Sequence, residues 1–573
     1  MNRDDACGPE RVRSLIPVWP GLARLILVLT AIMSAVAARA EPGDDALIET
    51  GRRIYEDGAL PGGDPLLAIR PEGFIMEGPH AACVSCHRRS GMGSVEGNID
   101  STVLVPPVAG PVLFTASRFA NSELDKSHHY VPNDAWERVL TRSVYDRQSL
   151  ARSLREGIDP DGKRLVAPMP RYNLDDTSVA ALSAYLEQLL SQPAPGVEPD
   201  ILHLATVVTP DARPAQADAV VGVLRAWSDS ARASGKLWRL QVWELAGPAE
   251  TWLPQLEQRY RQQPVFALLS GAGGSNWAPV HEFCEQQRVA CVLPSVEVAP
   301  DPRGDWYSMY FSPGVGLEAR VLARFLNQQK DSKSSGTTII QVYSDASGRH
   351  AADVLRTELD SDIGPVSHRR FRVTSPRTAL KNMTASDTLV LWLRPDEIAQ
   401  LVTELPQGPP AGRVFVSALL ATPGALALPA AWKARLSFVS LFDDVGLQGD
   451  IARLRLERWL ELKGLAGNGS RRFQADAYAA CYLLNDALGH IRGQEVRRPA
   501  VPLSREHLLE MLENLVNKYN DSTDLVDPDS HVAYYGRMSL GPRQRVAVRG
   551  GSIMRYKSPN SNKLISASDR IVP

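Results

Sequence analysis

The feature that most constrains the fold is an alternation between two kinds of segment in the C-terminal part of the chain. Short apolar runs have the length of buried strands: Ile201–Val208, Leu237–Glu244, Val265–Ser270, Ala290–Pro294, Thr337–Tyr343, Thr388–Leu393, Arg413–Ser417 and Leu436–Leu441. Amphipathic segments with helical spacing lie between them: Ala215–Ser234, Thr251–Gln263, Trp277–Gln287, Gly316–Gln329, His350–Asp360, Arg394–Glu404 and Asp450–Lys463. This alternation predicts βαβ units with parallel sheets, and their number exceeds one sheet, so we expect two Rossmann-like α/β lobes.

A proline-rich stretch, residues 191–200, separates this region from an N-terminal part of different composition. We therefore expect an N-terminal domain over residues 41–190, a linker over 191–200 and a two-lobed domain over 201–556. Residues 534–549 and 551–556 have the pattern of a terminal hairpin. The Ser- and Asn-rich residues 557–573 are expected to form a disordered tail.

Residues 1–40 have the organisation of a secretory signal peptide. Arginines at positions 11, 13 and 24 precede the apolar run 25–37, and the A-x-A sequence Ala38-Arg39-Ala40 precedes acidic residues. A membrane anchor is the alternative, but the run is shorter than the roughly 20 apolar residues of a spanning helix. We therefore expect a cleaved signal peptide, a periplasmic location and no transmembrane helix in the mature chain.

Composition narrows the function classes. The chain has 573 residues, of which 44% are hydrophobic and 22% charged, and these are values of a globular protein. Its formal net charge is -2, without the basic excess of a nucleic-acid-binding protein. We therefore expect no nucleic-acid partner.

The motif Cys83-Val84-Ser85-Cys86-His87 indicates covalent attachment of haem. Two thiols can add to the porphyrin vinyl groups, and the adjacent His87 can then ligate the iron. A thioredoxin-like redox pair would follow a strand, and residues 78–82 do not predict one. A zinc site needs a second pair of ligands, and the sequence offers no second cysteine pair at suitable spacing. The motif therefore predicts one covalently attached haem c.

Residues 45–190 resemble class I c-type cytochromes, which are small all-α domains. Met169 lies in the proline-bounded loop Ala167–Tyr172, and a helical pattern over 178–190 follows it. The resemblance implies that His87 and Met169 are the axial ligands of the iron and that the last helix packs on a helix around Gly51. It also implies that a proline carbonyl accepts the other ring N–H of His87, and Pro106 or Pro107 could supply it, with Pro107 the candidate chosen.

Alternatives for the second axial ligand are Met76, His80, His128 and His129, whereas Met92 is too close in sequence to His87 to reach the opposite face. The segment 117–145 is an insertion relative to simple members of the family and is either a partner-docking surface or a longer loop. An iron with both axial positions filled transfers electrons, and its thioether ligand favours the ferrous state.

The remaining cysteines carry less information. Of the 6 in the chain, Cys7 lies in the signal peptide, and Cys83 and Cys86 are assigned to haem. Cys284 and Cys291 could form a disulfide or remain a separate buried pair. Cys481 lies in an apolar helical pattern and is expected to be a core residue.

The region from about residue 200 to 555 resembles type I periplasmic solute-binding proteins of the branched-chain amino-acid receptor kind. The stretches that carry this resemblance are residues 268–280, 290–296, 305–314, 317–326, 341–349 and 473–478. The resemblance implies two lobes that close on a small ligand about a hinge. It places this domain among substrate-binding components of ABC transporters.

Backbone N–H groups and hydroxyls in a glycine- and serine-rich turn at a helix N-terminus can bind a carboxylate without a charged side chain. The candidate ligand-binding residues are Ser270, Ser275, Asn276, Ser295 and Tyr307, with Tyr310 and Asp345 as weaker candidates. Ordinary turn and capping chemistry is the alternative explanation for the same residues.

Three functions remain open. The leading hypothesis is a periplasmic electron-transfer protein whose receptor-like domain binds a small ligand or docks a redox partner such as a dehydrogenase or another cytochrome. The second is a haem-containing oxidoreductase that acts on a molecule bound between the lobes, although no acid–base constellation or G-x-S-x-G elbow supports catalysis. The third is a solute receptor with a redox-sensing haem.

Overall fold

The computed structural model describes residues 42–573 apart from 99–100, 116–141, 166–167, 230–231, 234, 330–337, 360–365, 371–379, 381, 409–410, 443–446, 468–470, 496–500, 522–534 and 536–537. The predicted signal peptide and most of the predicted insertion at 117–145 lie outside the described residues, as do His128 and His129. The chain forms two compact units, one of residues 1–85 and 145–188 and the other of residues 86–144 and 189–573. The boundary falls inside the predicted haem motif.

The first unit combines helices with a small antiparallel sheet. Its helices are α2 (Pro42–Arg52), the π-helix η1 (Arg53–Asp57), the 3-10 helix η2 (Gly78–His80), α6 (Arg147–Glu156) and α7 (Asp176–Gln188). Its strands β1 (Leu67–Ile69), β2 (Ile75–Glu77) and β5 (Arg171–Tyr172) pair in the order β2-β1-β5. The prediction of an all-α domain is therefore wrong for this unit. Five residues, 70–74, connect β1 to β2, and Gly73 there has a φ of 88° that favours glycine.

Helices α2 and α7 pack directly against each other, in agreement with the prediction that the last helix lies on a helix containing Gly51. A Cβ atom at Gly51 would lie 2.0 Å from the carbonyl oxygen of Ala181 and 2.7 Å from Cβ of Tyr185. Only glycine permits this approach of the two helix backbones. The rings of Tyr55 and Tyr185 lie beside the crossing with centroids 5.4 Å apart.

The second unit begins with residues 86–144, which the sequence had assigned to the N-terminal domain. The helix α3 (Val84–His87) crosses the unit boundary and is followed by the hairpin β3 (Ser94–Asn98) and β4 (Ser101–Val105) and the short helix α4 (Gly110–Leu113). Met92 is buried against Ala109, Val112, Leu190 and Val501. This packing explains why the segment belongs to the second unit, and it gives Met92 a structural role.

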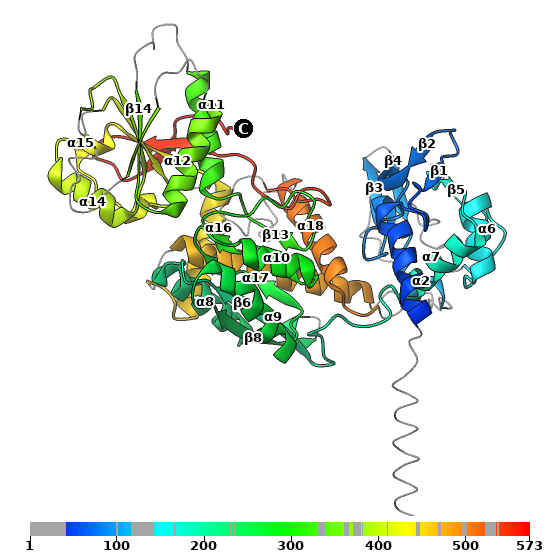
Figure 1. The fold of residues 1–573 in the computed structure, drawn as a ribbon. Coiled ribbons are helices and arrows are strands. Elements are labelled where there is room, and N and C mark those ends of the chain that lie inside the picture. Colours follow the sequence, from blue (N-terminus) through cyan, green and yellow to red (C-terminus); the bar gives the residue numbers. More distant parts are fainter. Residues whose placement is uncertain are drawn as a thin grey trace, which may run out of the picture. The chain divides into compact units, whose positions relative to one another are not determined.

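The first lobe of the second unit is a mainly parallel eight-stranded sheet covered by helices on both faces (Figure 1). Its strands are β6 (Ile201–Val208), β7 (Arg232–Ala233), β8 (Lys236–Glu244), β9 (Ala267–Leu269), β10 (Ala272–Gly273), β11 (Ala290–Val292), β12 (Ser295–Val296) and β13 (Ser308–Met309). Its helices are α8 (Pro214–Ser228), the 3-10 helix η3 (Ala249–Thr251), α9 (Trp252–Gln262), α10 (Ala278–Gln286), α17 (Arg471–Glu495) and α18 (Arg505–Asp521), together with the packed end of α16 (Leu447–Leu462).

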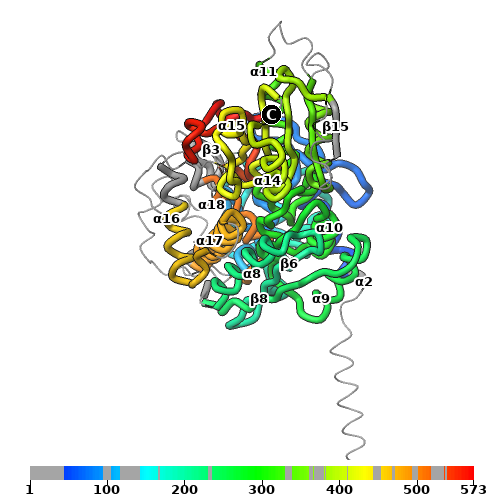
Figure 2. The backbone as a smooth tube through the Cα atoms, turned by 90° about the vertical axis from the view of Figure 1, so that its left-hand side faces the viewer, coloured from blue at the N-terminus to red at the C-terminus, as the bar shows by residue number. Residues whose placement is uncertain are grey.

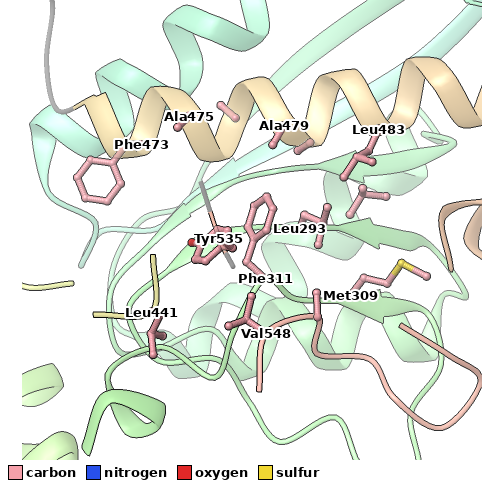
Figure 3. Packing of buried hydrophobic residues seen from close by; sticks show 14 of the residues in the cluster. Leu293, Met309, Phe311, Leu441, Phe473, Ala475, Ala479, Leu483, Tyr535 and Val548 are labelled. Atoms are coloured by element: carbon pink, nitrogen blue, oxygen red, sulfur yellow. The ribbon is translucent and has the colours of Figure 1, made fainter. Parts of the chain in front are cut away.

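Alternate residues of the strands serve opposite cores. Leu204 of β6 belongs to the cluster beneath α8 and α17, whereas Ala205 and Val207 belong to the cluster beneath α9 and α10. Helix α17 lies between α8 and α18 (Figure 2). Four of its side chains, Phe473, Ala475, Ala479 and Leu483, pack in one cluster with Met309 of β13 and with Leu293 and Phe311, which directly follow β11 and β13 (Figure 3). Successive side chains of a strand point to opposite faces of the sheet, and here both faces are apolar. Helices can therefore cover the parallel sheet on both sides.

The second lobe repeats this architecture with a seven-stranded sheet in the order β15-β14-β16-β17-β18-β19-β20. Its strands are β14 (Ile339–Tyr343), β15 (Val366–Arg370), β16 (Thr388–Trp392), β17 (Arg413–Ser417), β18 (Leu436–Ser440), β19 (Ser552–Tyr556) and β20 (Leu564–Ser566). Its helices are α11 (Val315–Gln328), α12 (Ala346–Glu358), α14 (Pro395–Glu404), the 3-10 helix η5 (Pro423–Ala425) and α15 (Ala430–Lys433). Figure 1 shows α11 and α12 on one side of this sheet and α14 and α15 on the other.

Two expectations about the C-terminal segments are wrong. The predicted hairpin partner of 551–556 is not 534–549: β19 pairs antiparallel with β18 and with β20, so its partners come from the second lobe and from residues 564–566. Residues 557–573 are therefore part of the fold rather than a disordered tail, and Gly551 also pairs with Ile571. In the predicted linker 191–200, the N–H of Ala194 donates to the carbonyl of Leu503 at 3.0 Å.

Candidate functional site

The carboxyl ends of several strands lie where the chain passes from one lobe to the other. From β12 the chain passes through residues 297–314 into α11 of the second lobe, and residues 545–551 return from the first lobe to β19. Ser295 and Val296 of β12 precede Glu297, and Asp345 and Arg394 follow β14 and β16. Carboxyl ends of parallel strands meet at one edge of each sheet, and in two-lobed α/β proteins the ligand lies at such edges. This inter-lobe edge is the candidate functional site.

Glu297 and Arg394 form an ion pair that links the lobes. Nη1 and Nη2 of Arg394 lie 2.5 and 2.7 Å from Oε1 and Oε2 of Glu297, a two-pronged arrangement, and the Glu297 side chain is 3% exposed. Ser347 at the start of α12 donates its hydroxyl to the same carboxylate at 2.7 Å, and Nε of Arg213 lies 3.3 Å away. Asp345 accepts a further bond from Arg394 at 2.6 Å. The cluster thus holds two carboxylates and two guanidinium groups across the inter-lobe edge.

Electrostatics keep this cluster ionised. Burial alone raises the pKa of Glu297, but the hydrogen bonds and charge of Arg394, with the charge of Arg213, outweigh burial and hold that pKa below its usual range. Burial lowers the pKa of Arg213 to about 10, which still leaves the guanidinium charged at neutral pH. Loss of either partner would leave the other charge buried without its counter-charge, which destabilises a folded protein strongly.

Ser270 and Trp277 each place a buried polar group at this edge. Ser270 follows β9 with a φ of 53°, which is rare for a residue other than glycine, and its side chain is buried. The Ser270 hydroxyl and the Trp277 indole N–H have no hydrogen-bond partner in the part of the chain that the structure describes. Gly271 permits the Trp277 ring to pack here, because a Cβ on Gly271 would lie 2.7 Å from it. Buried polar groups without partners are rare and are expected where a ligand or water binds.

Ser275 and Asn276, the other two residues predicted in this turn, lie beside an internal carboxylate. The carboxylate of Asp211 accepts the backbone N–H of Gly274 at 3.3 Å and that of Asn276 at 2.9 Å. An internal carboxylate therefore uses N–H groups that the sequence assigned to an external anion. Ser275 is half-buried beside this contact, and the Asn276 side chain is exposed.

Ser295 lies at the edge but is bound to protein. Its hydroxyl donates to Asp476 of α17 at 2.6 Å, and its backbone N–H donates to Gly271 at 2.9 Å, which places it next to the Ser270 turn. Arg472, one turn before Asp476, donates to the Leu419 carbonyl at 2.8 Å, and its buried Nε has no partner among the described residues.

Tyr307 and Tyr310 are not brought to this edge. Tyr307 donates its hydroxyl to Glu506 of α18 at 2.8 Å. The Tyr310 hydroxyl is buried and lies 2.9 Å from Nδ1 of His281. Asp345 does reach the edge, as the N-cap of α12 and a partner of Arg394.

Sequence reasoning missed Glu297, Arg394, Asp211 and Trp277. Glu297 and Arg394 each follow an apolar strand run within two residues, and charged residues at strand ends were the available signal. That they meet could not be foreseen, because one comes from each lobe.

Of the predicted haem residues, Cys83 lies in the first unit, and Cys86 and His87 lie in the second. Cys83 and Cys86 are thiols rather than a disulfide. Nδ1 of the buried His87 lies 2.9 Å from the carbonyl oxygen of Pro106, so Pro106 and not Pro107 is the partner, because the Pro106 carbonyl faces the ring. A carbonyl only accepts hydrogen bonds, so Nδ1 carries the proton and Nε2 presents its lone pair. Burial lowers the pKa of His87, which favours the neutral, metal-binding ring.

Met169 lies in the loop before β5 of the first unit. Its side chain is half-buried, and its carbonyl accepts from Arg171 at 2.7 Å. Of the alternatives, Met76 has its sulfur 3.3 Å from Nε of Arg70, and His80 is exposed.

The described residues offer few other candidate sites. No group of three or more His, Cys, Asp or Glu side chains among them could hold a metal ion, and no helix among them has the length and apolar character to cross a membrane. A cavity of about 1100 Å³ is lined by residues of the second lobe, Lys433 and Lys563 among them, together with Arg453 of α16. Cys284 and Cys291 form a disulfide, with Cα atoms 6.2 Å apart.

Comparisons with known proteins bear on the fold. No protein-family model matches the chain, and no curated protein matches it. A solved structure of a branched-chain amino-acid ABC transporter protein from Thermus thermophilus with bound valine is 11% identical, with a TM-score of 0.50, and the match covers 65% of this chain and 97% of that one. A fatty acid ABC transporter substrate-binding protein from Thermomonospora curvata is 13% identical, with a TM-score of 0.49, over 67% of this chain and 95% of that one. The Thermus match and the two sheets give the C-terminal region the two-lobed fold of type I periplasmic solute-binding proteins, which confirms the predicted fold.

Two buried carboxyl groups of the second unit predict a pH-dependent stability. Burial raises the pKa of Glu318 to about 8 and that of Glu510 to about 7. The folded protein therefore binds more protons than the unfolded chain between about pH 4.5 and pH 8, so the free energy of unfolding falls as pH rises through this window, by at most about 1.4 kcal/mol per pH unit for each group. Glu318→Gln should flatten this slope in urea unfolding measured from pH 5 to pH 8. The exposed Glu282→Gln serves as control, and an unchanged slope in Glu318→Gln would contradict the assignment.

Proposed function

We propose that the chain is an exported c-type cytochrome with one covalently attached haem c, joined to a receptor-like domain that binds a small molecule between its lobes. The observation that carries the haem assignment is the Cys83–His87 motif together with the bond from Nδ1 of His87 to Pro106. This bond fixes the ring orientation and tautomer that a haem ligand needs. The residues present therefore fit the group.

The roles of the residues follow from their chemistry. Cys83 and Cys86 would attach the porphyrin, and His87 and Met169 would ligate the iron. Haem c supplies reversible one-electron transfer when bound. Pro106 holds the proton of His87 on Nδ1, which keeps Nε2 available. With both axial positions filled by this chain, electron transfer to a redox partner such as a dehydrogenase or another cytochrome in the periplasm is favoured over catalysis at the iron.

The receptor part would take a small molecule with hydrogen-bond acceptors. Among the described residues, the buried groups near the inter-lobe edge that have no hydrogen-bond partner include the Ser270 hydroxyl, the Trp277 indole N–H and Nε of both Arg213 and Arg472, and each of them can donate. A carboxylate satisfies several donors at once, and the Thermus neighbour is described with valine, which carries one. We therefore propose a small carboxylate-bearing ligand.

The spectrum of the Met169→Ala variant tests the electron-transfer assignment. We expect the wild-type ferric protein to show the weak charge-transfer band of methionine-ligated haem, and the variant to lose this band and to bind carbon monoxide rapidly when reduced. Met92→Ala, which alters a packed methionine, should keep the band. Retention of the band in Met169→Ala would disprove the axial assignment.

Thermal unfolding tests the receptor assignment. A ligand that binds only the folded state raises the melting temperature in proportion to the logarithm of its concentration. We expect stabilisation by some members of a panel of amino acids and small carboxylic acids, and none by their amide or alcohol analogues. Ser270→Ala should reduce the stabilisation at each concentration. A panel without any effect would favour a docking role for the lobes.

A further inference from the structure

The segment that follows His87 is buried against helix α18 of the receptor-like lobe. Ser90 is fully buried, and both of its donors bond to Glu510: the backbone N–H at 3.0 Å, and the hydroxyl to the other oxygen. The hydroxyl in turn accepts the N–H of Met92 at 3.1 Å. Three residues after the proposed iron ligand, the backbone is thus held by a carboxylate from a distant part of the chain.

Glu513, one turn further along α18, lies between two arginines. One is Arg88, adjacent to His87, and the other is Arg545. The Glu513 side chain is 2% exposed and that of Arg545 is 1% exposed, so the charges are paired out of water. The Trp306 ring lies between Arg545 and Arg89, at 5.0 and 5.2 Å from their guanidinium carbons.

Helix α18 is itself fixed to the sheet of the first lobe. Arg505 at its start donates to the carbonyls of Phe266 at 2.9 Å and Val265 at 2.7 Å, at the beginning of β9. Tyr307 binds Glu506 from the side of β13. Glu510 and Glu513 therefore project from a support whose position the receptor core determines.

Arg545 connects this arrangement to the segment that joins the lobes. The N–H of Tyr310 donates to the Arg545 carbonyl at 2.9 Å, and the N–H of Val548 donates to Phe311 at 2.8 Å. A few residues later, Ser552 of β19 pairs with Ser440 in the second lobe. The side chain that binds Glu513 thus stands at the end of an inter-lobe connection.

We propose that Glu510 and Glu513 are positioning residues for the haem ligand His87, so that the receptor-like domain sets the orientation of this histidine and inter-lobe movement reaches it through Arg545, Glu513 and Arg88. This proposal rests on the proposed haem attachment. Removal of the Glu513 carboxylate leaves the buried Arg545 and the partly buried Arg88 without the carboxylate that both contact, which loosens the segment. Removal of the Ser90 hydroxyl loosens the segment without deleting a charged side chain.

The test uses the haem-loaded full-length chain with Glu513→Gln, Ser90→Ala and the exposed control Glu282→Gln. Hydrogen–deuterium exchange of residues 88–92 should accelerate at least tenfold in the first two variants and stay unchanged in the control. The midpoint potential should rise in Glu513→Gln, because a buried negative charge that favours ferric haem is lost. The potential should also shift in Ser90→Ala, because that variant loosens the segment after His87 while every charged side chain is kept.

The outcomes separate the two proposals. Wild-type protein without covalent haem would overturn the proposed function, whereas exchange at residues 88–92 would still report on the anchoring contacts. Attached haem with the wild-type potential in Ser90→Ala and Glu513→Gln would overturn the positioning role. This holds even if both variants are less stable, because a purely structural contact lowers stability without moving the potential. If Glu513→Gln does not fold, Ser90→Ala decides alone.

Discussion

Replacing both Cys83 and Cys86 with serine is expected to abolish covalent haem attachment. A serine hydroxyl does not add to the porphyrin vinyl groups as a thiol does, so no thioether bond can form at either position. The measurement is haem-specific staining of the denatured chain on a gel, together with a quantitative haem assay of the purified protein after production in a host that attaches haem c.

The matched control is Cys481→Ser. Cys481 is a buried thiol of the receptor-like domain within α17 and should have no role in attachment, so this variant should retain one haem per chain. Haem that survives denaturation in the Cys83→Ser/Cys86→Ser chain would contradict the assignment.

Arg394→Met is expected to destabilise the two-lobed unit by roughly 3–5 kcal/mol, because it leaves the Glu297 carboxylate buried without its main counter-charge. The guanidinium of Arg394 makes both close contacts to Glu297, and the remaining cation, Arg213, lies 3.3 Å away. The unfolding midpoint in urea, followed by tryptophan fluorescence, measures the effect.

Arg303→Met provides the comparison. Arg303 also pairs with an aspartate, Asp301, but its side chain is 90% exposed, so its removal should leave the midpoint unchanged. Glu297→Gln/Arg394→Met should recover part of the loss, since it removes the buried charge as well. An Arg394→Met protein as stable as wild type would show that the pair does not hold the lobes.

Much of the two-lobed fold could be predicted because it depends on local pattern. The run Ile201–Val208 is β6 with the predicted bounds, and Arg413–Ser417 is β17. Both are apolar runs between amphipathic helices. Strands that are apolar on both faces need helices on both sides of the sheet, and this is the α/β arrangement. The α2–α7 packing was implied by the resemblance to class I c-type cytochromes, and the structure gives its reason, since Gly51 lets the two helix backbones approach.

Segments whose structure depends on distant partners were predicted poorly. Residues 564–566 form a run of only three residues in a Ser- and Asn-rich segment, and they become β20 because β19 offers an unpaired edge. The N–H groups after Ser270 looked available to a ligand, yet Asp211, some 60 residues earlier, already uses two of them. The β1–β2 hairpin was missed because its strands are only three residues long.

The sequence by itself determined the class of fold of the C-terminal region, through alternating strands and helices for two lobes. It also predicts the haem chemistry, through two thiols and a histidine at one fixed spacing. Tertiary structure alone decided which groups meet. It chose Pro106 over Pro107 for His87, paired Glu297 with Arg394 across the lobes, and placed Glu510 and Glu513 against the residues that follow the haem motif. Local spacing can be read from the sequence, whereas buried charge pairs depend on contacts between residues that the fold brings together from distant parts of the chain.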